Sequence, residues 1–200
     1  MPVVQSRFKM PIAAAPHMRY NQSNYKDREG VQMSRNNDEM TVESLVVDYD
    51  LLLRQAQAFM DAERHFIPLL SNISALLKDT LRKVNWAGFY LVTEGGNLML
   101  GPFQGKPACI RIEKGKGVCG TALANNETVC VPNVHDFPGH IACDSASLSE
   151  IVVPVRDSSG TVKAVLDIDS PMEDRFFDRD RENLEQLCQM IGNKIIWEMQ

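Results

Sequence analysis

The order of hydrophobic patterns along the chain is the feature that most restricts its fold. Apolar residues recur at spacings of three and four from Leu52 to Leu81, with a break near Pro68, which predicts two amphipathic helices. A third helical pattern begins at about Asp178, a residue suited to an N-cap position. Between these helices lie runs of strand character, at residues 86–92, 97–100, 109–112, 128–131, 150–155 and 161–168.

Turn signals between the strand runs indicate how these runs pair. Gly95-Gly96 separates the first two runs and Ser158-Ser159-Gly160 separates the last two. Connections this short join antiparallel neighbours. We therefore expect an α+β fold with a central antiparallel sheet of about six strands, the N- and C-terminal helices packed on one face, and a long loop region on the other.

The long connection at residues 113–149 is rich in Gly, His and Asp. Connections of this length in compact domains are usually functional or disordered. Within it, Gly117-Val-Cys-Gly-Thr-Ala-Leu-Ala124 predicts a short helix with Cys119 in its first turn. Because helix N-termini lower thiol pKa values, this position predicts a Cys119 that favours the thiolate.

Composition excludes several classes of protein. The 200 residues are 44% hydrophobic and 24% charged, close to the globular average. A net charge of -5 argues against nucleic acid as a partner, because phosphate binding needs a clustered basic surface. The sequence holds no apolar run of the roughly 20 residues that span a bilayer, so no membrane association is expected.

The cysteine count and the first residues bear on compartment and domain organisation. Five cysteines without an even-spaced framework favour a reducing compartment, and we expect a cytoplasmic protein. Residues 1–26 lack Asp and Glu, a weak resemblance to an organellar transit peptide, but Pro2, Pro11 and Pro16 interrupt the helix such a signal needs. We therefore expect a disordered or loosely ordered extension at 1–40, followed by one domain at 41–200.

Three cysteines stand in settings typical of redox chemistry. Cys109, Cys119 and Cys143 are surrounded by glycines, prolines and charged residues, and nearby cations, helix starts or a second thiol make a thiolate reactive. Cys130 alternates into a strand-like run and Cys188 lies on an apolar helical stripe. We interpret these last two as core residues.

Two acids alternate with apolar residues in Leu166-Asp-Ile-Asp169. Alternation places Asp167 and Asp169 on one face of a strand and the apolar residues on the other. Two like charges on one apolar strand are costly unless a cation lies between them or one carboxyl is protonated. The sequence thus predicts a site that holds a proton or a cation.

Seven sequence blocks, in this order, resemble the free methionine-(R)-sulfoxide reductases, which are built on a GAF domain. The resemblance covers about 150 residues, roughly from Tyr49 to Trp197, and includes the three cysteines of redox character. The blocks are Asn85-Trp-Ala-Gly-Phe-Tyr-Leu-Val92, Leu100-Gly-Pro-Phe-Gln-Gly105, Ala108-Cys-Ile-Arg-Ile112, Gly117-Val-Cys-Gly-Thr-Ala122, Gly139-His-Ile-Ala-Cys-Asp144, Ser149-Glu-Ile-Val152 and Val165-Leu-Asp-Ile-Asp-Ser170.

The resemblance implies reduction of free L-methionine-(R)-S-oxide to methionine, with electrons from thioredoxin and with no metal or organic cofactor. It implies attack of a cysteine thiolate on the sulfoxide sulfur, a sulfenic acid, and a disulfide that thioredoxin reopens. We assign Cys143 as the attacking residue and Cys109 as the resolving one. Cys119 remains an alternative for either role, because the sequence does not order the three.

The resemblance also implies the residues of the substrate pocket. Glu150, Asp167 and Asp169 match the acids of the family, and Trp86 and Tyr90 match the aromatic residues that enclose the substrate methyl group. A neutral acid would meet the sulfoxide oxygen and a carboxylate would pair with the ammonium group. The substrate carboxylate would meet backbone N–H groups near Ile141, Ala142 and Cys143.

Two alternatives to a reductase remain. The first is a zinc site built from Cys109, Cys119, His135, His140 and Cys143, although no pair has the tight spacing of structural zinc sites. The second is a GAF module that binds a small molecule and signals without catalysis. Such modules are normally tethered to an output domain, which 200 residues do not supply. The oligomeric state stays open, with a homodimer as one option.

Overall fold

The computed structural model describes residues 45–139 and 145–197. Its helices are α1 (Tyr49–Ala62), α2 (Phe66–Thr80), α3 (Gly117–Asn125) and α4 (Asp178–Lys194), with a 3-10 turn, η2, at Val134–Asp136. Its strands are β1 (Trp86–Val92), β2 (Leu98–Gln104), β3 (Arg111–Ile112), β4 (Val129–Val131), β5 (Ser149–Arg156) and β6 (Val162–Ser170). No helix in these two ranges combines the length and the apolar character that crossing a membrane requires.

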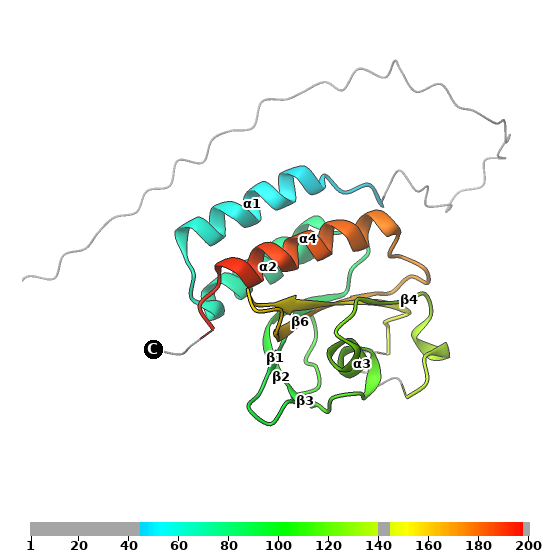
Figure 1. The fold of residues 1–200 in the computed structure, drawn as a ribbon. Coiled ribbons are helices and arrows are strands. Elements are labelled where there is room, and N and C mark those ends of the chain that lie inside the picture. The colour runs from blue at the N-terminus through cyan, green and yellow to red at the C-terminus, as the bar shows by residue number, and fades with distance from the viewer. Residues whose placement is uncertain (1–44, 140–144, 198–200) are drawn as a thin grey trace, which may run out of the picture. The chain divides into compact units, whose positions relative to one another are not determined.

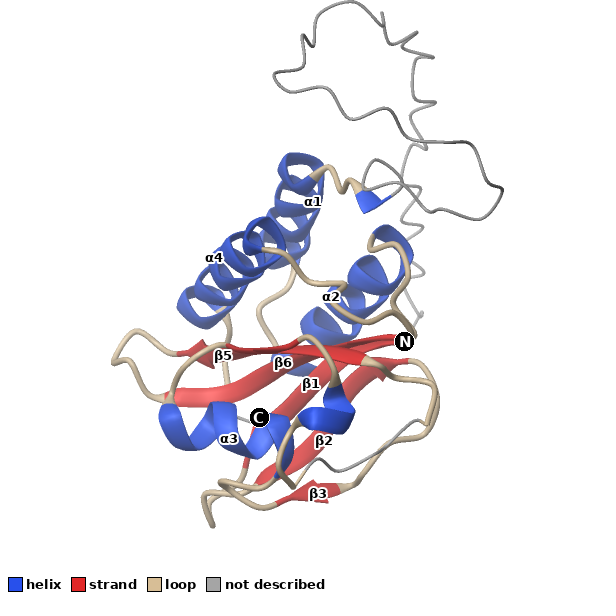
Figure 2. Cartoon of the chain, turned by 90° about the vertical axis from the view of Figure 1, so that its right-hand side faces the viewer, coloured by secondary structure: helices blue, strands red, loops and turns tan. Residues whose placement is uncertain are grey.

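The strands form one six-stranded sheet in the order β3-β2-β1-β6-β5-β4, and every neighbouring pair is antiparallel. Helices α2 and α4 pack on one face of the sheet, and α1 packs on these two helices (Figure 1). Helix α3 lies on the opposite face (Figure 2). The α+β prediction, with terminal helices on one face and a loop region on the other, is confirmed.

The two faces of the sheet have separate hydrophobic cores. Alternation along β6 sends Leu166 and Ile168 into the core beneath the helices, and it sends Val165 into the core beneath α3. The α3-side core also contains Trp86, Tyr90 and Cys119. Among the described residues, those predicted to form the site therefore belong to the sheet face that α3 covers.

Strand β2 is longer than predicted, because it continues through Gly101 and Pro102. The register against β1 moves from Gly88↔Phe103 to Tyr90↔Leu100, so β2 has an extra residue there and forms a bulge. A bulge tolerates proline, which lacks an N–H for the ladder. Strand β3 is shorter than predicted: it begins at Arg111, which leaves Cys109 outside the sheet.

The helix boundaries differ in two places from those predicted. The break between α1 and α2 lies at residues 63–65, and Pro68 lies in the first turn of α2, where no intrahelical N–H is required. Asp178 is the first residue of α4 and not its N-cap. The capping acid is Asp180, whose carboxylate accepts the N–H of Phe177 at 2.9 Å.

Residues 1–40, predicted as a separate extension, lie outside the described residues. The domain boundary at residue 41 stays a prediction.

Candidate functional site

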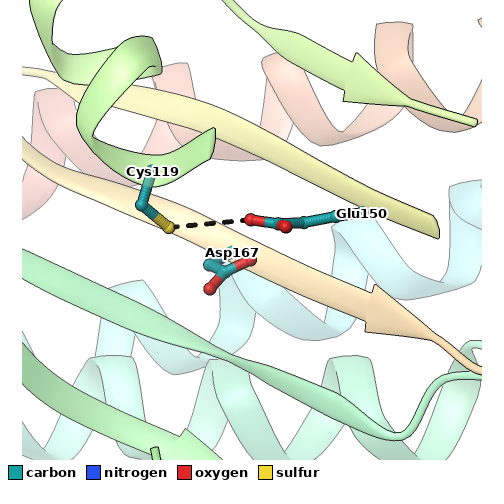
Figure 3. Close-up of side chains that lie close together, drawn as sticks. All are labelled: Cys119, Glu150 and Asp167. Atoms are coloured by element: carbon teal, nitrogen blue, oxygen red, sulfur yellow. Dashed lines mark hydrogen bonds between the residues drawn. The ribbon is translucent and has the colours of Figure 1, made fainter. Parts of the chain in front are cut away.

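Adjacent strands and helix α3 bring three predicted site residues together on the α3 face of the sheet (Figure 3). Glu150, near the start of β5, is paired with Asp169 of β6, and Asp167 lies two residues earlier on β6. Cys119 is in the first turn of α3, which packs against β5 and β6. Residues from three separate elements therefore converge, which a linear sequence pattern alone cannot show.

Cys119, Glu150 and Asp167 form a compact cluster. The Cys119 thiol donates a long hydrogen bond to Glu150 Oε1, with 3.9 Å between the two atoms. One sulfur or oxygen atom from each of the three residues lies within 4.8 Å of the others. Their exposed fractions are 4%, 6% and 7% respectively, so the cluster is shielded from water. Asp169, by contrast, is half-buried.

Burial favours the protonated forms of the two acids. It raises the pKa of Glu150 well above its usual range, and the charges of Asp167 and Asp169 raise it further. Burial also raises the pKa of Asp167 to about 7. The raised pKa of Asp167 agrees in direction with the expectation of a protonated carboxyl on β6.

The predicted thiolate at Cys119 is wrong for this arrangement. Burial raises the pKa of the Cys119 thiol well above its usual range, and Asp167 and Glu150 add to the effect. The helix N-terminus acts in the opposite direction, but α3 has only 9 residues and its dipole competes with desolvation and two nearby acids. Cys119 is therefore a neutral thiol near pH 7.

The residues just before β5, which lead into Glu150, are held in place by hydrogen bonds to several segments of the chain. Asn85 Nδ2 donates to Ser147 Oγ at 3.0 Å, and the N–H of Leu148 donates to the Ser170 carbonyl at 2.7 Å. The Leu148 carbonyl in turn accepts the N–H of Val134 at 2.8 Å. These bonds fix where β5 begins and so position Glu150.

An aromatic group lies on the same face of the sheet as the acids. Trp86 stacks on Tyr90, with ring centroids 5.9 Å apart, and on Phe103, with centroids 5.2 Å apart and an interplanar angle of 13°. The Trp86 indole N–H donates to the Lys106 carbonyl at 3.1 Å. Trp86 and Tyr90 are 3% and 1% exposed, so both also serve as core residues.

Phe103 belongs to this aromatic group, and the sequence analysis missed it. The strand pattern there was ended at Leu100, because Gly101-Pro102 resembles a turn. Extending the alternation across a bulge would have placed Phe103 opposite Gly88 and beside Trp86. The available signal was the aromatic residue directly after the Gly-Pro pair.

The other cysteines occupy different settings. Cys109 is half-buried and packs against the α3-side core that contains Cys119. Cys188 is 1% exposed, which confirms its assignment to the core. Cys130 is exposed, so its assignment to the core is wrong. Because β4 is the edge strand of the sheet, the face that carries Cys130 is not fully covered. Cys143, Ile141 and Ala142 lie outside the described residues.

The described residues group three potential metal ligands only at Cys119, Glu150 and Asp167. The alternative zinc site is built from a different set of residues, and the structure describes three of them, Cys109, Cys119 and His135. These three are not brought together, and His135 is exposed on η2. His140 and Cys143, the remaining members of that set, lie outside the described residues.

Comparison with known proteins agrees with this geometry. The GAF domain family matches residues 45–195. The free methionine-R-sulfoxide reductase of Escherichia coli is 52% identical over 143 residues, 72% of this chain and 86% of that protein. The enzyme of the same name from Saccharomyces cerevisiae is 41% identical over 167 residues, 80% of this chain and 89% of that protein.

A solved structure gives the same result. The free methionine-R-sulfoxide reductase from Neisseria meningitidis, in complex with its substrate, superposes with a TM-score of 0.69 at 41% identity, covering 72% of this chain and 86% of that chain. The family model, the two relatives and the solved structure therefore agree. The chain belongs to the free methionine-(R)-sulfoxide reductase family of GAF-domain proteins.

Proposed function

We propose that this protein reduces free L-methionine-(R)-S-oxide to L-methionine, using cysteine thiols as the immediate reductant. The observation that carries the proposal is the cluster of Cys119, Glu150 and Asp167, which places two buried acids with raised pKa values beside a thiol. Relatives with reductase names, one of them solved with its substrate, support the same assignment over a non-catalytic sensor.

The proposed reaction has two steps at the protein. A thiolate attacks the sulfoxide sulfur while the oxygen is protonated, and the sulfur–oxygen bond breaks with loss of hydroxide. Hydroxide then attacks the cysteine sulfur and displaces methionine, which breaks the new sulfur–sulfur bond and leaves a cysteine sulfenic acid. A second thiol then attacks the sulfenic sulfur, which forms a disulfide and releases water. The sulfoxide gains two electrons and the pair of cysteines loses them, so no metal or organic cofactor is required.

Glu150 is the proposed proton donor. The sulfoxide oxygen becomes a good leaving group only when it is protonated, and a positioned general acid can supply that proton. Burial and the neighbouring acids keep Glu150 neutral near pH 7, which is the state a donor needs. Asp169, paired with Glu150 across the two strands, is the second candidate for this role.

Asp167 is the proposed partner of the substrate ammonium group. Among the described residues, no group hydrogen-bonds its Oδ1 atom, although the side chain is 93% buried. An ammonium group that approaches a buried carboxyl stabilises its charged form. Trp86 and Tyr90, on the same face of the sheet, would enclose the methyl group of the substrate.

The three cysteines take the roles that the family resemblance implies. Cys143 is the proposed attacking residue and Cys109 the proposed resolving residue. The raised pKa of Cys119 makes it a poor nucleophile before substrate binds, which disfavours it as the attacking residue. Thioredoxin is the proposed reductant of the disulfide, and this requirement fits a cytoplasmic setting.

The direct test supplies purified protein with the two sulfoxide diastereomers of free methionine and with thioredoxin, its reductase and NADPH. The proposal predicts that only the R-sulfoxide is consumed, with one NADPH oxidised for each methionine formed. Dithiothreitol replaces the thioredoxin system in a parallel assay. Turnover with dithiothreitol alone would keep the reductase assignment and refute thioredoxin as the reductant, whereas no turnover in either assay would refute the reductase.

A further inference from the structure

The Trp86 indole runs along β1 and covers Gly88. A Cβ atom built on Gly88 would lie 2.7 Å from Trp86 Cη2, the far edge of the indole. It would also lie 2.3 Å from Phe103 Cβ and 2.7 Å from Phe103 Cα, distances that real Cβ atoms do not show. The indole therefore occupies the space that any side chain at position 88 would need.

The position of Gly88 in the sheet fixes what the indole separates. Gly88 is paired with Phe103 of β2 on one side and with Asp167 of β6 on the other. The far edge of the Trp86 indole thus lies over Gly88, the residue of β1 that stands between Phe103 of β2 and Asp167 of β6.

The five-membered ring of the Trp86 indole is held by its contacts with Gly105 and Lys106. A Cβ on Gly105 would lie 2.5 Å from Trp86 Cδ1, and the φ angle of Gly105 is +142°. The indole N–H donates to the Lys106 carbonyl at 3.1 Å. The hydrogen bond anchors the five-membered ring, so movement at the far edge is limited by the rings stacked on the indole, Phe103 at 5.2 Å and Tyr90 at 5.9 Å between centroids.

We propose that Phe103 is a positioning residue that holds the Trp86 indole against the acid cluster and thereby limits the size of the alkyl group that the pocket accepts. The inference rests on the proposed function, in which Trp86 encloses the substrate methyl group. Phe103 acts through Trp86 and need not touch the substrate. Without the aromatic ring the indole can tilt toward β2, which enlarges the pocket on the side of Asp167.

Substrate discrimination tests this role. The variant is Phe103→Leu, which keeps an apolar side chain and removes the flat ring. The substrates are the R-sulfoxides of methionine and of ethionine, which differ by one methylene. A pocket of fixed size distinguishes one methylene by about 10- to 200-fold in kcat/KM. We expect Phe103→Leu to lower the preference for the methyl compound by about tenfold, chiefly through KM.

Indole packing is measured independently of turnover. The chain has two tryptophans, so a Trp197→Phe background leaves Trp86 as the sole indole fluorophore. In this background Phe103→Leu should raise the acrylamide quenching constant of Trp86 at least twofold. The matched control is Leu98→Val, which alters a fully buried residue of the same strand and the same core but leaves the contacts of Trp86 intact. Quenching and discrimination should both follow the parent in that control.

The outcomes separate the proposal from the function on which it rests. Increased quenching with unchanged discrimination, or unchanged quenching, would refute the role of Phe103. If Leu98→Val changed quenching and discrimination as much as Phe103→Leu does, the changes would reflect a general loss of stability, and the proposed role of Phe103 would be refuted. If the parent protein turned over neither sulfoxide, the proposed function would fail. The quenching arm, together with binding of both sulfoxides followed by Trp86 fluorescence, would still decide whether Phe103 sets the pocket size.

Discussion

The thiol of Cys119 and the carboxyl of Glu150 lie 3.9 Å apart between their Sγ and Oε1 atoms, although 31 positions separate them in sequence. Both groups are buried and both have raised pKa values. Near pH 7 this contact joins a neutral thiol to a neutral acid. The site therefore holds a protonated acid beside a protonated thiol, which suits a reaction that must protonate a departing oxygen.

Replacement of Glu150 by Gln should slow the formation of methionine in a single turnover by about a hundredfold or more. The amide keeps the size and the hydrogen bonding of the side chain but cannot donate a proton as an acid. Rapid-quench measurement of the first turnover separates this step from disulfide reduction. Glu127→Gln, at an exposed position, is the matched control and should retain the parent rate. First-turnover rates that match between Glu150→Gln and the parent would rule out Glu150 as the donor.

Asp167 should make the protein less stable as the pH rises from about 4 to about 7. The pKa of this carboxyl is raised from 3.8 to about 7 in the folded state, so between these values the folded chain holds a proton that the unfolded chain releases. The stabilisation is fully present below pH 4 and is lost as the pH passes 7. The whole effect amounts to at most about 4 kcal/mol, since each pKa unit corresponds to about 1.4 kcal/mol.

The Asp167→Asn variant lacks this titration. Between pH 5 and pH 8 its free energy of unfolding should therefore increase relative to that of the parent. Urea denaturation at both pH values measures the difference. Asp136→Asn, at an exposed position, controls for the amide. A parent and an Asp167→Asn variant with parallel pH dependence would show that the buried carboxyl does not hold its proton.

In kinetics, Asp167→Asn should mainly raise KM if this residue pairs with the ammonium group.

Replacement of Cys143 by Ser should abolish turnover, because a hydroxyl is a far poorer nucleophile toward sulfur. Cys109→Ser should still form one methionine per chain but should stop before the disulfide that thioredoxin reduces. Cys130→Ser, at the exposed edge strand, is the control and should retain activity. An active Cys143→Ser together with an inactive Cys119→Ser would exchange the roles of these two residues.

Methionine sulfoxide within a peptide should be turned over negligibly compared with the free amino acid. The proposed pocket recognises the free ammonium group through Asp167, and an internal residue of a peptide lacks that group. The comparison uses N-acetyl-methionine-sulfoxide amide and the free R-sulfoxide at equal concentrations. Comparable kcat/KM values for the two compounds would contradict the assignment of Asp167.

Local patterns predicted much of the fold and part of the site. Period-two alternation assigned Asp167 and Asp169 to one face of β6, and helical spacing placed Cys188 in the core. The Gly101-Pro102 bulge concealed Phe103, because its register depends on pairing with β1. The exposure of Cys130 depends on β4 lying at the sheet edge, a property of strand order.

The pKa of Cys119 shows most clearly what the local sequence does not determine. Its place in the first turn of α3 follows from local sequence, but its protonation state follows from Glu150 and Asp167, which other elements bring to it. Local sequence predicts helix position well. Desolvation and charge at a buried thiol are set by the tertiary structure.

The most direct test of the account is one turnover without any external reductant. Fully reduced protein is mixed with excess free methionine-(R)-sulfoxide, and methionine and free thiols are counted after denaturation. Of the five cysteines in the chain, two should be lost for each methionine formed, with one methionine per chain. Absence of methionine, or methionine formed without loss of thiols, would contradict reduction by the cysteines of this site.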